Sequence, residues 1–303
     1  MNKRIVVMGA TGNTGRPIAE QLLKQGHQVV ALGREATKLE ALKAQGAILA
    51  VGDQLDSAFL TQAFQGADVV YAMTPPNWAV DDFAAYQDAA GQATAAALAA
   101  AGVTKVVHLS SQGADLPAGN GPVAGLYRQE ARLNLVPGLS VVHLRPTYFL
   151  ENVFMFLGQV PSGTIYSHLQ PTGVTPMIAT ADIAAVAARY LAEPTFTGRT
   201  VVDLLGAADY SFADVLAAFR EHLGVPNLQW VVIPDDAQLA GMIQFGLKPS
   251  LAAMYVELGQ AINRGFFANH VARSATNTTP TTLAQFAAQV LAPAYKAQGQ
   301  AQA

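Results

Sequence analysis

A glycine-rich segment near the N-terminus has the residue types and the spacing to bind a phosphate group. It lies between a β-branched run over residues 4–8 and a helix-like pattern over residues 16–24. Glycines in such a turn let the backbone approach a pyrophosphate, and the N-terminus of the next helix favours negative charge. A turn that only packs a strand against a helix is the alternative, but the position and spacing favour phosphate binding. The residues predicted to contact the phosphates are Gly9, Thr11, Gly12, Asn13, Thr14 and Gly15.

The residues after the second predicted strand, residues 29–32, indicate which dinucleotide is bound. An acidic residue about 20 positions beyond the glycines would hold the ribose 2′-hydroxyl of NAD. This chain has Arg34 there, which can pair with a 2′-phosphate, and Lys38 adds a second positive charge one helical turn later. Glu35 leaves two alternatives open, because it could restore NAD binding or neutralise Arg34, and all these charges could simply be solvated. We predict a preference for NADP(H) over NAD(H).

The elements that must position these residues alternate between strand and helix. Apolar strands are predicted over residues 4–8, 29–32, 47–51, 67–72, 105–109 and 140–144, and helices over 16–24, 38–43, 57–64, 82–101 and 126–135. Such short and almost wholly apolar strands must be buried on both faces. The pattern therefore predicts an α/β fold with a doubly wound parallel sheet of the Rossmann type.

The alternation loosens after residue 146, where prolines and glycines mark irregular connections. We therefore expect an NAD(P)-binding Rossmann domain over residues 1–150 and a smaller α+β substrate lobe over residues 151–303. A helical pattern over 180–191 and an extended run over 199–204 indicate that segments within about 177–205 return to the main sheet.

The composition excludes several classes of function. The formal net charge is −3 without a Lys/Arg cluster, which predicts no direct nucleic-acid binding. No apolar stretch reaches the roughly 20 residues that span a bilayer, so no membrane segment is expected. The absence of cysteine suits a reducing cytoplasm, and a hydrophobic content of 51% is compatible with a homodimer. No metal site is expected, because the six histidines are isolated in sequence: His27, His108, His143, His168, His222 and His270.

Three motifs together resemble the atypical short-chain dehydrogenase/reductase families of the NmrA-like and quinone-oxidoreductase kind. They are GATGNTG at residues 9–15, VGD at 51–53 and RPTYFLENV at 145–153. The resemblance implies an NAD(P)H-binding Rossmann domain with a smaller C-terminal lobe, and a small-molecule substrate bound between them.

The resemblance also assigns residues to parts of the cofactor, at the ends of strands where parallel sheets bind ligands. It implies that Asp53 and Gln54 lie near the adenine, although Asp53 could equally be a loop carboxylate or helix cap. Ser110 and Ser111 would face the nicotinamide, with a hydrogen-bonded turn as the alternative. The remaining implied cofactor residues are Met73, Thr74, Pro75 and Pro146.

The proton-transfer pair of short-chain dehydrogenases, a Tyr with a Lys four residues later, is missing from the fifth predicted helix. Tyr127 is followed by Ala131 at that spacing, so we interpret it as a core or interface aromatic rather than an acid. The resemblance implies that Glu130 matches an acidic position of the family. Tyr148 and His168 are further weak catalytic candidates, and packing residues are the simpler interpretation. Residues that could shape an acceptor pocket are Asn77, Trp78, Tyr148, Phe149, Tyr166 and His168.

These residues favour an NADPH-dependent reductase of a quinone-like or other small conjugated substrate, acting by direct hydride transfer. Such an acceptor needs no dedicated protein acid. A non-catalytic NAD(P)(H)-sensing regulator of the NmrA-like kind is the alternative. A nucleotide-sugar epimerase is disfavoured, because it would require proton-transfer groups that the sequence does not present.

Overall fold

The computed structural model describes residues 2–268 and 270–302. Contacts between Cα atoms divide the chain into two compact units. The first unit comprises Met1–Pro117, Val123–Arg145 and Thr180–Val202. The second unit comprises Ala118–Pro122, Pro146–Ala179 and Asp203–Ala303. The chain thus passes between the units several times.

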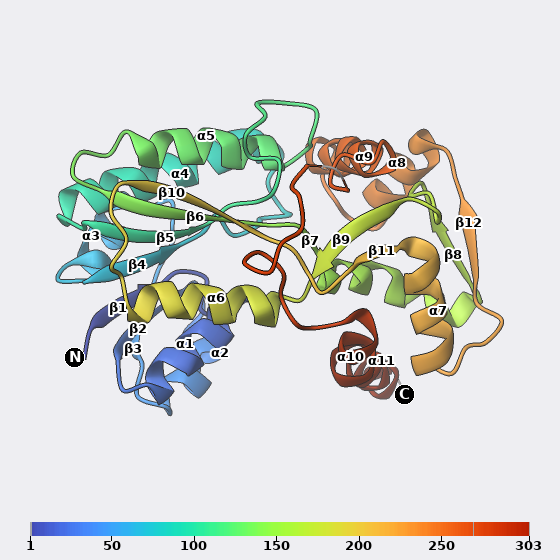
Figure 1. Cartoon of the computed structure of the whole chain (residues 1–303), viewed down its shortest axis with the longest axis horizontal. Helices are drawn as coiled ribbons and strands as arrows, with labels where there is room; N and C mark the ends of the chain where they lie inside the picture. Colours follow the sequence, from blue (N-terminus) through green and yellow to red (C-terminus); the bar gives the residue numbers. More distant parts are fainter. Residues whose placement is uncertain (1, 269, 303) are drawn as a thin grey trace. The chain divides into compact units, whose positions relative to one another are not determined.

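A parallel sheet, seven-stranded within the described residues, forms the centre of the first unit (Figure 1). Its order is β10 (Arg199–Leu204), β6 (Ser140–Pro146), β5 (Lys105–Leu109), β4 (Val69–Ala72), β1 (Arg4–Val7), β2 (Gln28–Gly33) and β3 (Ile48–Val51). The sequence order runs outward in opposite directions from β1 and β4, so the switch point lies between these strands. The predicted doubly wound Rossmann sheet is confirmed.

Helices cover both faces of this sheet (Figure 1). One face carries α1 (Gly15–Lys24), α2 (Ala36–Lys43) and α6 (Thr180–Ala192), and the other carries α3 (Ser57–Phe64), α4 (Phe83–Ala100) and α5 (Val123–Asn134). Val6, Val70 and Val106 pack with Leu98 and Leu133 on the second of these faces. Because side chains alternate along a strand, Ser110, His108 and the equivalent residues of β6 also lie toward α5.

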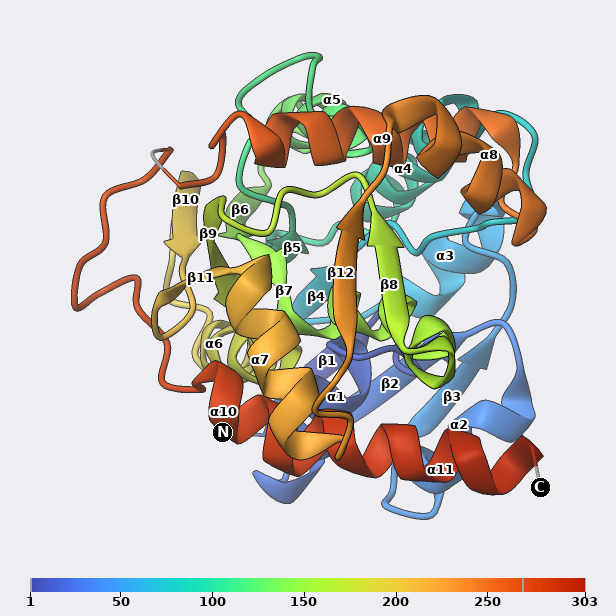
Figure 2. The ribbon, with the colours of Figure 1, turned by 90° about the vertical axis from the view of Figure 1, so that its right-hand side faces the viewer.

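The second unit is a mixed α+β structure around its own core. A three-stranded sheet has the order β11 (Asp209–Ser211), β9 (Val174–Ile178) and β7 (Tyr148–Phe149), and β12 (Gln229–Val232) pairs in parallel with β8 (Thr164–Ser167) (Figure 2). The helices are a 3₁₀ helix (Leu150–Ser162), α7 (Phe212–His222), α8 (Asp235–Gln244), α9 (Pro249–Asn263), α10 (Leu283–Phe286), a π-helical turn (Ala287–Leu291) and α11 (Ala292–Gln302). Phe212 packs between Tyr148 and Trp230 in its core, with ring centroids 5.9 and 5.6 Å away.

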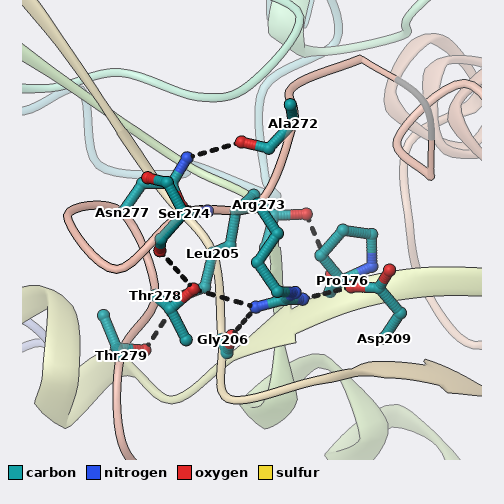
Figure 3. A network of polar contacts seen from close by, with 11 residues as sticks. Pro176, Leu205, Gly206, Asp209, Ala272, Arg273, Ser274, Asn277, Thr278 and Thr279 are labelled. Carbon is teal, nitrogen blue, oxygen red and sulfur yellow. Dashed lines mark hydrogen bonds and ion pairs between the residues drawn. The ribbon is translucent and has the colours of Figure 1, made fainter.

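A polar network fixes the long connection between α9 and α10 to the rest of the second unit (Figure 3). The Arg273 guanidinium donates to the Gly206 carbonyl oxygen and forms an ion pair with Asp209. The Thr279 hydroxyl donates to the Leu205 carbonyl oxygen at 3.0 Å. Backbone and charge-assisted bonds thus hold this connection without a regular helix or strand.

Among the described residues, none of the helices combines the length and the apolar character that a bilayer crossing requires.

Candidate functional site

The predicted phosphate-binding turn lies at the switch point, between β1 and α1. Gly9 has a φ of 61°, in the left-handed region that favours glycine, and its carbonyl oxygen accepts a 2.9 Å hydrogen bond from the Gly12 N–H. A Cβ on Gly15 would lie 2.2 Å from the Gly9 oxygen, so a side chain there would displace the backbone. Gly12 and Asn13 are exposed, which leaves the outer side of the turn open to a ligand.

The N-terminus of α1 is suited to an anion. Thr14 is the N-cap residue, but no side chain caps this helix within the described chain. The Thr14 hydroxyl instead accepts a 3.0 Å bond from Tyr71, whose pKa is raised by complete burial. The Arg16 N–H donates to the Gly12 carbonyl oxygen at 3.1 Å, and Pro17 has no N–H, so the helix dipole and the lack of a side-chain cap are what favour a bound phosphate here. The turn therefore fits the pyrophosphate of a dinucleotide.

The charged residues after β2, Arg34, Glu35 and Lys38, are all exposed. Lys38 forms a 2.7 Å ion pair with Glu35, and both side chains are exposed. Glu35 is thus paired with Lys38, and no ion pair between Glu35 and Arg34 occurs within the described residues. The Arg34 side chain is exposed at the end of the strand. The positive charge of Arg34 remains available, whereas that of Lys38 is partly balanced.

A second polar cluster lies beyond the ends of β3 and β4. The buried Gln54 side chain donates a 2.5 Å hydrogen bond to the Tyr86 hydroxyl, which donates to the Pro75 carbonyl oxygen at 3.1 Å. Burial raises the pKa of Tyr86, while Gln54 and the nearby Arg34 act in the opposite direction. The exposed Asp53 accepts from the Leu55 N–H at 2.9 Å as a loop carboxylate, whereas the N-cap of α3 is Asp56.

Met73 and Thr74, which follow β4, lie beside the glycine turn, whereas Tyr86 of the polar cluster lies on α4. Met73 packs against the glycine turn, because a Cβ on Gly9 would lie 2.8 Å from the Met73 sulfur. Thr74 is half-buried beside it. Sequence reasoning missed Tyr86, which lies on α4 and reaches Gln54 only through the fold. A tyrosine on an apolar helix face carries no sequence signal beyond packing.

Ser110, at the end of β5, belongs to a buried charged network. Its hydroxyl donates to Glu130 of α5 at 2.5 Å. The same carboxylate accepts two hydrogen bonds from the Arg145 guanidinium, at 2.9 and 2.6 Å. The Asp115 carboxylate lies 3.9 Å from Arg145. The Ser111 hydroxyl donates to the Gln112 carbonyl oxygen at 3.0 Å, so both serines act as donors within the protein.

His108 and His143 are 35 residues apart in sequence but adjacent in the structure. Parallel pairing of β5 with β6 places them side by side, with their Nδ1 atoms 3.0 Å apart. The Asn134 side-chain oxygen accepts from His143 Nε2 at 3.1 Å, so neutral His143 accepts at Nδ1 from His108. Burial lowers the pKa of both imidazoles. Among the described residues, no cluster of three or more potential ligands could hold a metal ion.

Tyr127 is not a core residue, contrary to part of its sequence interpretation. Its side chain is 37% exposed on α5, because Gln129, Glu130 and Leu133 occupy the buried face of that helix. In the first unit, the Asn77 side chain accepts from the Ala79 N–H at 3.2 Å. Trp78 is 56% exposed.

Candidates in the second unit have mainly packing roles. Tyr148 lies in the aromatic core, where burial raises its pKa and makes it a poor proton donor. His168 is buried and hydrogen-bonded to Asp235 through Nδ1 at 2.8 Å. Hydrogen bonds from Gln260 and His168 hold the pKa of Asp235 below its ordinary value. Pro146 is buried, Phe149 is half-buried, and Tyr166 is exposed.

The first unit has the features of Rossmann-type NAD(P)-binding proteins. They are a glycine turn at the switch point, a following helix without a side-chain cap, and a basic residue after β2. The model of the NmrA-like family matches residues 1–287. The chain belongs to the NmrA-like family, which confirms the resemblance seen in its motifs.

Three proteins of known name are similar to this chain in sequence. Agroclavine dehydrogenase of Claviceps fusiformis is 32% identical over 170 residues, 54% of this chain and only about half (56%) of that protein. The (4-alkanoyl-5-oxo-2,5-dihydrofuran-3-yl)methyl phosphate reductase of Streptomyces griseus is 28% identical over 261 residues, covering 86% of this chain and 88% of that protein. Quinone oxidoreductase 2 of Escherichia coli is 25% identical over 267 residues, with the same coverage.

A crystal structure of the Escherichia coli NADPH-dependent quinone oxidoreductase, complexed with NADPH, is similar over 95% of this chain and 99% of that one. The TM-score is 0.80, at 25% sequence identity. The relatives that match most of the chain are thus reductases. In general terms, the chain is an NAD(P)-dependent reductase.

Proposed function

We propose that the chain reduces a quinone-like or otherwise conjugated small molecule with NADPH, by direct hydride transfer. The observation that carries the proposal is the open glycine turn with its uncapped helix at the switch point. The reductase relatives along most of the chain support it. NADPH supplies a hydride from its nicotinamide ring when bound.

The residues of the first unit suit successive parts of this cofactor. The turn at residues 9–15 would hold the pyrophosphate, and Arg34 would hold the 2′-phosphate, because Glu35 is paired with Lys38. The Ser110 hydroxyl donates to Glu130 and therefore presents only acceptor lone pairs, which suits the carboxamide N–H of nicotinamide. The remaining proposed cofactor contacts are Asp53, Gln54, Met73, Thr74, Pro75 and Ser111 of this unit, and Pro146 of the second unit.

The proton that completes the reduction is proposed to come from solvent. Tyr127 has Ala131 rather than a lysine four residues later, and Tyr148 has a raised pKa. Neither residue is therefore equipped as a general acid at neutral pH. Conjugated acceptors spread the added charge onto an oxygen that water can protonate, so direct hydride transfer suits this chain.

The test combines turnover with binding. NADPH oxidation is followed by absorbance with a panel of quinones and other conjugated carbonyls, and calorimetry gives the affinities for NADPH, NADP and NADH. We expect tight NADPH binding and acceptor-dependent oxidation. Tight binding without turnover on any acceptor would favour the sensing regulator instead. Failure to bind any dinucleotide would refute both functions.

We also propose a cytoplasmic location, because NADPH is a cytoplasmic reductant and the chain contains no cysteine. The apolar composition supports a homodimer. Light scattering coupled to size-exclusion chromatography measures the mass directly, and a monomer at micromolar concentration would contradict the dimer.

A further inference from the structure

A tight turn fixes Gln112 directly after the end of β5. The Ala114 N–H donates to the Ser111 carbonyl oxygen at 3.1 Å, and Gly113 has a φ of 90°. These features define a type II turn with Gln112 at its second position. The Ser111 hydroxyl adds a 3.0 Å bond to the Gln112 carbonyl oxygen. The backbone of Gln112 is therefore held at the strand end where a Rossmann sheet binds its ligands.

The Gln112 side chain is unusual among the buried polar groups of this unit. It is fully buried, with 0% exposure, yet neither its Nε2 nor its Oε1 has a hydrogen-bond partner within the described part of the chain. Burying an amide without a partner is unfavourable, and each such group in a native protein calls for an explanation. Gln129 is equally buried and accepts from Arg132 at 2.8 Å. A single buried atom, such as His108 Nε2, also lacks a partner, but Gln112 differs in that both polar atoms of its side chain lack one within the described residues.

The two serine hydroxyls that precede Gln112 have no proton to donate to its Oε1. The Ser110 hydroxyl donates to Glu130, and the Ser111 hydroxyl donates to a backbone oxygen. Both hydroxyl protons beside Gln112 are consequently already used. A buried amide that presents one free donor group and one free acceptor at a ligand-binding strand end matches a ligand with a carbonyl oxygen.

We propose that the Gln112 side-chain amide binds the carbonyl oxygen of the conjugated acceptor. The inference rests on the proposed reductase function and assigns its acceptor-binding residue. Hydride addition to the conjugated system places an electron pair on that oxygen, and the Gln112 N–H group donates to it. A solvent proton then converts the oxygen to a hydroxyl, which can donate to Gln112 Oε1. A neutral amide stabilises this charge without titrating.

Two substitutions test the proposal against a purely structural role. Gln112→Met keeps the side-chain length but removes both polar atoms. We expect kcat/KM for a quinone such as menadione to fall by about 100-fold, as for loss of one oxyanion-binding amide. The affinity for NADPH should stay within about twofold, and the melting temperature should not fall, because no hydrogen bond is lost. Gln129→Met is the matched control, with a lower melting temperature and unchanged kcat/KM.

Gln112→Glu provides a second variant with a distinct signature. A carboxylate has no N–H group and repels the charge that develops on the acceptor oxygen, whereas the carboxylic acid regains a donor. We therefore expect kcat/KM to rise as the pH falls, in contrast to the wild-type profile. A residue with only a packing role would not produce this change. This variant also decides the question if Gln112→Met does not fold.

The outcomes separate this inference from the proposed function. An active wild-type protein with equal kcat/KM in both Gln112 variants would overturn the inference and leave the reductase intact. A wild-type protein without turnover would overturn the reductase. Calorimetric binding of menadione to the NADP-loaded protein would then decide the inference: weaker binding by Gln112→Met supports it, and equal or absent binding overturns it.

Discussion

Replacing Glu130 by alanine tests how strongly the buried charged network holds β5, β6 and α5 together. The carboxylate accepts hydrogen bonds from Ser110 and twice from Arg145, and the Glu130 and Arg145 side chains are 7% and 16% exposed. Removing one partner of a buried ion pair costs about 3–5 kcal/mol, because the remaining charge stays uncompensated. Asp115, 3.9 Å from Arg145, offers partial compensation, so we expect a loss of about 3 kcal/mol in the free energy of unfolding.

Thermal unfolding followed by circular dichroism measures this loss. For a chain of this size, about 3 kcal/mol corresponds to a decrease in melting temperature on the order of 6–12 °C. Asp88→Ala is the matched control, because Asp88 accepts from Arg128 and Arg132 on a more exposed surface of α4 and α5. Its expected loss is below about 1 kcal/mol. A Glu130→Ala protein that melts within about 2 °C of the wild type would refute the reasoning.

Three further predictions concern the cofactor and the buried histidines. Arg34→Asp is expected to weaken NADPH binding by about 10- to 100-fold in calorimetry, through loss of a charge-assisted bond, and to spare NADH. Gly15→Ala is expected to lower the melting temperature, since its Cβ would lie 2.2 Å from a backbone oxygen, whereas Gly12→Ala, at 3.3 Å, should mainly weaken NADPH binding. The free energy of unfolding is expected to fall as the pH drops below about 6.5, because burial lowers the pKa of His108 and His143 and the unfolded chain therefore takes up more protons. In His108→Leu, the melting temperature should depend less on pH in this range.

For each of these three predictions, one experimental outcome would contradict the reasoning. Equal losses of NADPH and NADH affinity in Arg34→Asp would show that the guanidinium does not contact the 2′-phosphate. A Gly15→Ala protein with the wild-type melting temperature would mean that the turn adapts to a Cβ. An unchanged pH dependence in His108→Leu would assign acid destabilisation to other groups.

The sequence predicted those features that depend on local pattern. The strands from Arg4 to Leu144 and the glycine turn follow from runs of apolar residues and from the position of the glycines between strand and helix. Several boundaries shift by one or two residues, and the largest shift is at the start of α5, which lies at Val123 rather than Leu126. Gly125 interrupts the helical pattern there because a Cβ would lie 2.2 Å from the Gln87 side chain of α4. Close packing of two helices, rather than a helix end, explains that glycine.

The parts of the site that escaped prediction depend on long-range contacts. Tyr86 and Gln54 are 32 residues apart, and Glu130 joins a serine of β5 to an arginine of β6. Charged residues are rarely buried, so Glu130 on the inner face of α5 contradicts the usual expectation for its type. The unpartnered state of Gln112 exists only in three dimensions. Periodicity carries no information about which buried polar atoms find partners.

In the proposed reductase, the buried polar groups between β5, β6 and α5 have a positioning role. Strand alternation places Ser110, directly after β5, and Arg145 and His143 of β6 on the face that α5 covers. Glu130 accepts from Ser110 and Arg145, and Asn134 accepts from His143. Every one of these bonds fixes an orientation and none supplies a free acid. Rigid positioning of the strand end that carries Ser110 is therefore the contribution of this network, and the proton can come from water.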